Sequence, residues 1–427
     1  MIASIIPDIV EEHWEESGFL WALRCAAAHK PSFSLENLAE LDERVEAHLD
    51  GLRVAGQEGW DLCLKLATWE EAGEAFTFGV LALEHANEEM LKEILARTAK
   101  EPKLARGLIS ALAWVDPSTT QSRISKLFAS ESPIERFVGI SAAAVNRLRI
   151  DAALAAALKD SHELVRARAC RAIGEIGRVE LAAALLPEIN SESEFCAYWS
   201  SWSLGLLRGD PAALERLRAF ALSDSPRQRQ ALELLLRRCD FASAMDIQRR
   251  LSKSPEHMRL AIIAAGIIGD PAFVPWLCAQ MNNPKLLRLA GDAFQTITGA
   301  DFVLDRLRRN SPPRPPVPED EGTDEAPDPD SDLTWPEPAA VLRWWDRNGG
   351  QFKTGVRHFL GKPMAVESFR AALPVSQQHQ RAAAALELAI RQPGLPLFET
   401  RARASQQKKL LAAELRPAPT PPPTKKP

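Results

Sequence analysis

The sequence predicts an all-α protein built as a solenoid, in which pairs of short helices stack along one axis. Three observations lead to this prediction. A unit recurs at steps of 29 to 32 residues through the middle of the chain, a shared residue recurs inside it, and turn signals recur around it. Such repetition is typical of repeat proteins, in which each unit buries its apolar face against the next.

The unit is clearest between residues 159 and 186. A polar turn precedes a run whose small and apolar residues fall on one helical stripe: Val165, Ala169, Ala172, Ile173 and Ile176. Gly177 ends this helix, and a second apolar run over residues 181–186 predicts another helix. Neither helix can bury its stripe alone, so each pair needs neighbours.

One position in each unit forms a column along the repeats. Its members are Arg106, Arg136, Arg166, Tyr198, Arg229, Arg259 and Arg288. An apolar residue follows six positions after each member, and pairs such as Ser132-Pro133 precede most of them. The pattern resembles HEAT-like repeats, whose second helix carries Val-Arg-x-x-Ala-x-x-Ala, as found here from Val165 to Ala172. This resemblance implies a HEAT-like solenoid over residues 96–310.

The column has two interpretations. A basic ladder on the concave surface could bind an acidic partner or the phosphates of a nucleic acid. Alternatively, each guanidinium bonds the carboxylates or carbonyls of a turn and holds neighbouring repeats together, as the matching residue commonly does in HEAT-like repeats. We favour the structural interpretation and predict it for Arg166, Arg259 and Arg288.

The unit without the arginine is rich in aromatic residues. It contains Phe195, Trp199, Trp202 and the chain's only tyrosine, Tyr198. These rings either fill a widened gap between repeats or anchor a partner. We expect Trp199 to lie in the core, and Tyr198, at the column position, to lie on the surface.

Residues 1–95 predict helices that do not follow the repeat. They hold 20 acidic against 6 basic residues, a net charge of −14. Because the end units of a solenoid must close its apolar face, we expect an acidic N-terminal helical cap. Its tryptophans are expected in the core rather than against a ligand: Trp14, Trp21, Trp60 and Trp69.

The composition changes after the repeats. Residues 311–332 contain seven prolines and eight acidic residues, so we expect a disordered linker. Residues 333–412 regain apolar character and predict a small basic helical module, attached through the linker as a separate unit. Its strongest helix is predicted over residues 377–391. Residues 413–427 are Pro-rich and are expected to form a disordered tail.

Location and redox state follow from composition. The six cysteines occur singly, without a Cys-x-x-Cys pair, which favours reduced and buried thiols. The first 16 residues lack a basic start and already contain five acidic residues, unlike a secretory signal. The longest apolar run, residues 260–269, is too short to span a bilayer. We therefore expect a cytoplasmic protein without membrane contact.

The sequence lacks the motifs of common active sites. It has no Gly-rich phosphate loop, no Gly-x-Ser-x-Gly and no His-Glu-x-x-His. None of its eight histidines lies three or four residues from another, which argues against a metal site on one helix. A single His162-Glu163 pair does not fit the iron-dependent hydroxylases built from HEAT-like repeats. We expect no enzyme activity, no cofactor, no metal and no small-molecule substrate.

Beyond the repeats, several segments resemble a family of proteobacterial HEAT-like proteins often associated with type VI secretion genes. The segments are residues 13–21, 41–52, 298–302, 380–384 and 393–398. They touch both ends and the middle of the chain. The resemblance implies an accessory role near a secretion system, and it implies no catalytic residue.

These observations favour a non-catalytic scaffold or adaptor that binds a protein, such as a type VI secretion effector or a spike component. One alternative is an immunity protein that binds and blocks a toxin. A second is a nucleic-acid-binding or DNA-repair protein of HEAT-like repeats. Only the column and Trp202 support this alternative, so we do not expect nucleic acid as a partner. The residues predicted to bind the partner are Tyr198, Trp202, Arg229 and Arg259.

Overall fold

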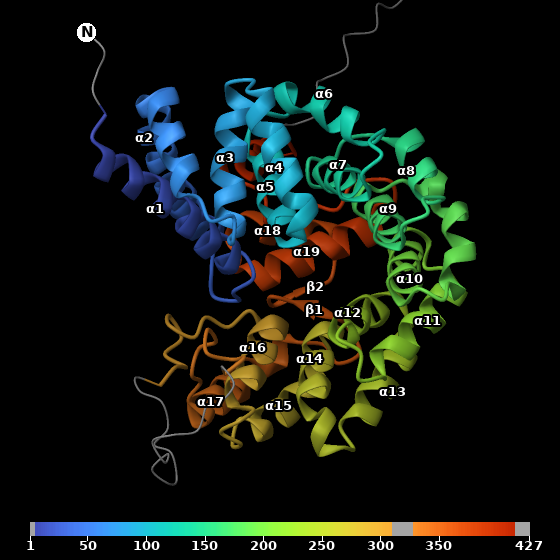
Figure 1. Cartoon of the computed structure of the whole chain (residues 1–427). Helices are drawn as coiled ribbons and strands as arrows, with labels where there is room; N and C mark the ends of the chain where they lie inside the picture. The colour runs from blue at the N-terminus through green and yellow to red at the C-terminus, as the bar shows by residue number, and fades with distance from the viewer. Residues whose placement is uncertain (1–4, 310–327, 415–427) are drawn as a thin grey trace, which may run out of the picture.

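The computed structural model describes residues 5–309 and 328–414 and forms an arc of stacked helices (Figure 1). Its first half comprises α1 (Pro7–Ala27), α2 (Leu35–Leu66), α3 (Ala72–Glu84), α4 (Glu88–Lys100), η1 (Pro102–Leu104), α5 (Ala105–Trp114), α6 (Pro117–Leu127), α7 (Pro133–Val145), α8 (Asp151–Ala157) and α9 (Glu163–Ile176). The arc continues through η2 (Val179–Asn190), α10 (Glu194–Arg208), α11 (Pro211–Ala221), α12 (Gln228–Arg238), α13 (Phe241–Leu251), η3 (Pro255–His257), α14 (Met258–Ile268), η4 (Pro271–Phe273), α15 (Val274–Gln280) and α16 (Leu287–Thr298). The remaining elements are α17 (Pro338–Asn348), η5 (Gly349–Gln351), β1 (His358–Phe359), β2 (Lys362–Pro363), α18 (Val366–Val375), α19 (Gln378–Arg391) and α20 (Ala404–Glu414).

The predicted all-α solenoid is confirmed. One row of helices packs side by side along the inside of the arc, namely α3, α5, α7, α9, α10, α12, α14 and α16. Other helices such as α6, α11 and α13 back this row on the outside, and the apolar core runs between the two rows. The column residues all fall in the first turn of inner helices, from Arg106 in α5 to Arg288 in α16.

The turn signals read from the sequence sit at helix ends. Proline occupies the first turn of α6, α7 and α11, where a missing backbone N–H costs no hydrogen bond. Left-handed glycines terminate α9, α10, α14 and α16: Gly177, Gly209, Gly269 and Gly299. Because such a residue cannot continue the helix, these four inner helices stop at their glycines.

The N-terminal cap is helical, as predicted, and its tryptophans are buried. Its long helix α2 is interrupted at Gly56, where φ is +60°. Helices α3 and α4 already pack like a stacked pair, because α3 lies against α5 of the next unit. The arc therefore begins within the residues assigned to the cap.

The C-terminal part of the chain does not form the tethered module that the sequence analysis predicts. Helix α17 extends the arc by packing on α15, while residues 357–414 return along its inside (Figure 1). Helix α19 packs against α10 and α12, and α20 packs against α2. The expected helix over residues 377–391 is present as α19. A short hairpin, in which strands β1 and β2 have two residues each, was not predicted.

The returning segment bonds to the free ends of the inner helices. The last carbonyls of a helix have no partner within it, so they accept from any donor placed there. The Arg357 guanidinium donates to carbonyls at the ends of α12 and α14, including Ile268 O at 2.9 Å. The backbone N–H of Leu397 donates to Glu175 O, near the end of α9, at 2.9 Å. These bonds make residues 357–414 an inner layer of the solenoid.

Part of the predicted linker also packs on the solenoid. Asp330 forms a two-pronged ion pair with Arg259, at 2.6 and 2.8 Å, and Asp328 pairs with Arg288. Asp332 lies 3.3 Å from the Nζ of Lys30 in the loop after α1. The rest of the predicted linker, and the tail from residue 415, lie outside the described residues. No helix in the described ranges combines the length and the apolarity needed to cross a membrane.

Candidate functional site

A large hollow lies between the start of the arc and the returning C-terminal segment. It has a volume of about 800 Å³, and α1, α5, α7, α9 and residues 399–403 form its walls. We call it the cationic cleft. Its charged lining residues are Arg24, Lys103, Arg106, Arg168, Arg171, Arg401 and Arg403 on the basic side, against Glu175 and Glu399. The imbalance favours an anionic ligand.

A buried ion cluster forms the floor of the cleft. The Glu175 carboxylate accepts from Arg168 Nη2 at 2.8 Å and from Arg171 Nε at 2.7 Å. Burial alone would raise the pKa of this carboxyl, but Arg168, Arg171 and Arg147 outweigh burial and lower the pKa to about 2. Glu175 is therefore ionised at neutral pH and fixes two of the arginine side chains.

The C-terminal segment contributes a second carboxylate. Residues 392–403, which we call the strap, connect α19 to α20 across the ends of the inner helices. Glu399 in the strap pairs with Arg401 at 2.8 Å and with Arg147 at 3.3 Å. Burial opposes ionisation of Glu399, yet the charges of Arg401 and Arg147 hold its pKa well below its usual range. The strap is thus a short peptide that the arginines already hold through a carboxylate.

Some cleft cations are fully engaged. Arg24 pairs with Asp42 at 2.7 Å and also donates to two strap carbonyls. Arg403 reaches Glu46 at 2.6 Å and lies over the ring of Trp114. These arginines fasten the strap to α1, α2 and α5, and they leave no donor that needs a ligand.

Other cleft cations have free donors. Arg168 is only 9% exposed, and its Nη1 atom is buried without any hydrogen-bond partner among the described residues. Lys103 and Arg106, at the start of α5, make no hydrogen bond or ion pair within the described parts of the chain, although Arg106 lies 5.2 Å over the ring of Trp21. A buried unpaired N–H costs free energy that an incoming acceptor would recover.

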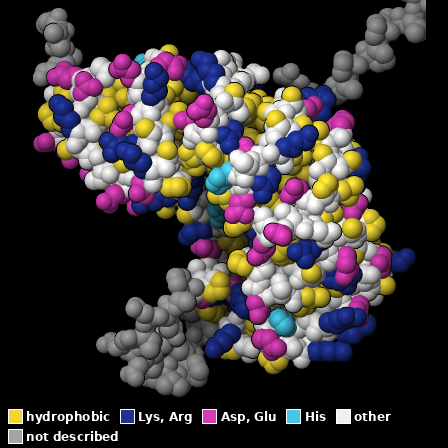
Figure 2. Space-filling view, turned by 45° about the vertical axis from the view of Figure 1, so that its right-hand side comes forward, with side chains coloured by type: hydrophobic (Ala, Val, Ile, Leu, Met, Phe, Trp, Pro, Cys, Tyr) yellow, Lys and Arg dark blue, Asp and Glu magenta, His cyan; other side chains and the backbone are white. Residues whose placement is uncertain are grey.

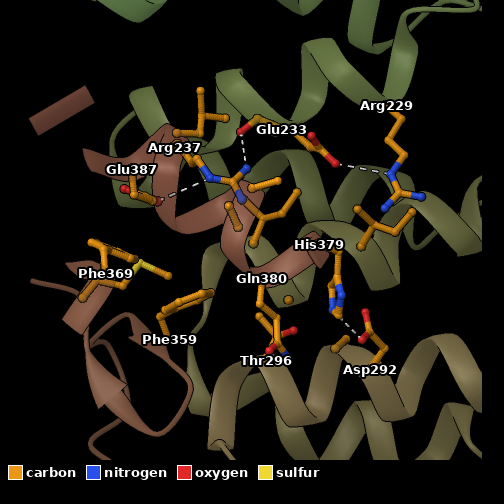
Figure 3. A pocket seen from close by; sticks show the side chains of 18 of the residues that line it. Arg229, Glu233, Arg237, Asp292, Thr296, Phe359, Phe369, His379, Gln380 and Glu387 are labelled. Atoms are coloured by element: carbon orange, nitrogen blue, oxygen red, sulfur yellow. Dashed lines mark hydrogen bonds and ion pairs between the residues drawn. The ribbon is translucent and has the colours of Figure 1, made fainter. Parts of the chain in front are cut away.

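A smaller hollow of about 230 Å³ lies where α19 meets α12, α14 and α16 (Figure 3). Its charged residues pair with one another. Arg229 lies 3.3 Å from Glu233, His379 lies 2.9 Å from Asp292, and Arg237 faces Glu387 at 3.5 Å. Because its charges are matched by the protein, this hollow is better explained as a seam between two layers than as a ligand site.

The four residues predicted to bind a partner do not form one site. The prediction that Tyr198 lies on the surface is wrong. Tyr198 is completely buried, its ring is packed edge-on against Phe220, and its hydroxyl bonds to Gln230. Trp202 is also buried, at the edge of a hollow of about 320 Å³ beside the cleft. Arg229 is well exposed at the seam. Arg259 is engaged by Asp330. A large side chain at the column position fills the gap between repeats.

The structural interpretation of the column agrees with the observed contacts. Arg166 Nη1 donates to Asp160 O at 2.7 Å and Ser161 O at 3.0 Å, in the turn before its own helix. Arg136 reaches the same turn through the Asp160 carboxylate, at 2.6 and 2.9 Å. Consecutive repeats therefore share one turn as their partner. Arg259 and Arg288 differ, because their acidic partners come from residues 328–330.

Among the residues that line the cleft, Arg106 belongs to the predicted column, but most of the charged residues were not predicted. Arg168 and Arg171 follow the column residue of α9 by two and five positions, and neither was singled out. A signal was present, because a charged residue among the small residues of α9 must find a partner or a ligand when the helix is buried on the inside. Glu399 and Arg401 gave no such signal, since only the fold brings the strap to α9.

The face of the molecule shown in Figure 2 carries no dominant charge. Figure 2 shows basic and acidic side chains interspersed over one face of the molecule, without a continuous area of either sign. Within the described ranges, no three His, Cys, Asp or Glu side chains gather as a metal ion would require. The described cysteines are all free thiols.

The comparison with protein families finds HEAT repeats. Residues 150–237, from the start of α8 to α12, match the model of HEAT repeats, which is less than half of the chain. No curated protein and no solved structure matches the chain. Repeats of this kind generally serve as scaffolds for protein interaction.

Proposed function

We propose that this protein is a non-catalytic scaffold that binds a protein partner through the cationic cleft. The observation that carries the proposal is the presence of free cationic donors in a large hollow on the inside of a HEAT-repeat arc. Residues 357–414 pack against other parts of the inside, including α10 and α12, and the proposal places the partner in the cleft beside them.

The proposed setting is the cytoplasm, as an accessory protein of type VI secretion. The support is the resemblance of several segments to HEAT-like proteins that accompany such gene clusters. An effector or a spike component would then be the partner. The alternative is an immunity protein that blocks a toxin. The architecture described above suits both roles, and the identity of the partner distinguishes them.

Affinity capture with the full chain tests the scaffold proposal. Lysate of the source cells is passed over the wild-type protein and over a Lys103→Ala/Arg106→Ala variant, whose changed side chains are exposed. An Arg249→Ala/Lys253→Ala variant on the outer part of α13 and the loop after it is the matched control, since it removes the same charge. We expect a protein that is held by wild type and control and depleted with the cleft variant.

The captured protein is then purified and titrated by calorimetry. Saturable binding at a fixed stoichiometry is the expected result. Identical recovery on all three columns would contradict the proposal, because the cleft would then have no part in binding. A captured toxin that loses its activity on binding would identify the immunity alternative.

A further inference from the structure

The chemistry of the cleft specifies the ligand more narrowly than the scaffold proposal does. Arg168 is held rigidly, because its Nε donates to Ser141 Oγ at 2.9 Å and its Nη2 donates to Glu175. Its third nitrogen, Nη1, is buried at the wall of the cleft and has no hydrogen-bond partner among residues 5–309 and 328–414. A guanidinium fixed in this way is pre-organised to receive an oxygen anion at little cost in conformational entropy.

The strap shows which anion this environment accepts. Glu399 brings a carboxylate to Arg147 and Arg401, and the carbonyls of Arg401 and Ala402 after it accept from Arg24 of α1. Leu397 O accepts from Arg147 Nε at 2.7 Å, and Leu397 N–H donates to Glu175 O. The inner face thus already binds a carboxylate-bearing peptide, which is its own.

The free donors are too widely spaced for a single small anion. Arg168 belongs to α9, whereas Lys103 and Arg106 precede or begin α5, and α7 lies between these helices. Packed helices lie roughly 8–10 Å apart, so the axes of α5 and α9 are roughly 16–20 Å apart. An extended peptide rises about 3.3 Å per residue, so about five or six residues would cover this distance.

We propose that the cationic cleft binds an extended acidic peptide segment of the partner, with its carboxylates on Arg168, Arg106 and Lys103. This inference rests on the proposed scaffold function and deepens it. A long polyanion fits less well, because the cleft opens beside residues 1–95, whose net charge is −14. Nucleic acid would be repelled there, whereas a short peptide can end within the cleft.

Fluorescence anisotropy with the full chain tests this inference. The probe is a labelled hexaglutamate peptide, with hexaglutamine and a duplex DNA of random sequence as comparison ligands. We expect saturable binding of hexaglutamate that weakens as salt rises, and binding of hexaglutamine at least about tenfold weaker. Lys103→Ala/Arg106→Ala should weaken hexaglutamate binding about tenfold or more, and Arg249→Ala/Lys253→Ala less than about twofold.

Arg168→Lys keeps the charge but removes the planar fork. We expect Arg168→Lys to weaken hexaglutamate binding severalfold. Its melting temperature shows whether the variant folds. If it does not fold, the Lys103→Ala/Arg106→Ala variant still tests the inference, because its changed side chains are exposed. Equal losses in the two double variants would show non-specific attraction and overturn the inference. Duplex DNA that binds more tightly than hexaglutamate through the same residues would overturn it as well. A captured protein that binds independently of the cleft residues would overturn both this inference and the cleft's role in the scaffold. A captured protein that needs those residues, together with no binding of hexaglutamate, would overturn this inference alone.

Discussion

The arginines of the inner helices have two separate uses. Arg166 points along its own helix to the preceding turn and donates to the carbonyls of Asp160 and Ser161. Arg168, two residues later, lines the cleft and donates to Glu175. Two arginines two positions apart on one helix therefore have different roles. Arg166 holds neighbouring repeats together, whereas Arg168 has a donor without a partner among the described residues.

Replacing Arg166 by alanine tests the structural use. The two turn carbonyls would lose a charged donor, and we expect the free energy of unfolding to fall by about 1–3 kcal/mol. Arg249→Ala, on the exposed part of α13, should change it by less than about 0.5 kcal/mol. Urea unfolding followed by circular dichroism measures both. Unchanged stability in Arg166→Ala together with lost partner binding would instead make the column a binding surface.

The buried carboxylates predict a dependence of stability on pH. The pKa of Glu175 is about 2 in the folded protein, against an ordinary value of 4.5, and the pKa of Glu399 is also lowered. A group with a depressed pKa in the folded state stabilises the fold fully above its unfolded pKa and loses this contribution as pH falls toward the folded pKa. We expect urea midpoints to be level from pH 7 to about 5 and to fall steeply between about 4.5 and 2.

Glu175→Gln provides the comparison for the pH series. It cannot ionise, so its stability should be lower at pH 7 and should fall less between pH 5 and pH 3 than that of the wild type. If the two proteins lose stability in parallel over this interval, Glu175 does not carry the acid sensitivity.

The inner layer depends on close contact with helix ends. Gly177 ends α9 with φ at +76°, and a Cβ added there would lie 2.6 Å from Leu395 O of the strap. Gly209 ends α10 in a similar conformation, with φ at +62°, but an added Cβ would meet only Arg238 side-chain atoms at 3.6 Å or more. The two glycines thus have the same backbone requirement and different surroundings.

Alanine at these two glycines separates strain from contact. Gly209→Ala should cost about 1–2 kcal/mol for the left-handed backbone alone. We expect Gly177→Ala to cost more, by about 1–3 kcal/mol, because the strap must also move. Thermal unfolding of the two variants gives the comparison. Equal losses would mean that the strap does not lie against α9 as described.

At the scale of elements, the repeats could be predicted and the inner layer could not. The period, the stripe from Val165 to Ile176 and the proline and glycine signals are local, so the sequence alone was sufficient for the arc. The position of residues 357–414 depends on bonds such as Arg357 to Ile268 O and Gln406 Nε2 to Ala113 O, which join residues far apart in the chain. Because residues 333–412 lack the repeat pattern, the sequence predicts a separate module there and gives no indication of the cleft that they help to form.

For the whole molecule, charge distribution argues against nucleic acid as a partner. The repeats carry a net charge of only +7, from 30 basic and 23 acidic residues over 96–310, and the visible face is mixed in sign. We expect duplex DNA or RNA to bind no more tightly than the weak micromolar range of non-specific binding at physiological salt. A gel-shift titration checks this, and salt-sensitive nanomolar binding would contradict the scaffold proposal.

The central claim is that residues 357–414 are an inner layer of the solenoid and complete the cleft. Hydrogen–deuterium exchange of the full chain, read by mass spectrometry, tests it most directly, because amides in a cooperative unit exchange together. We predict that peptides covering α19 and the strap exchange as slowly as those from α9 and α14. Exchange of α19 and the strap within seconds, while α9 and α14 stay protected, would contradict the claim and restore the separate module.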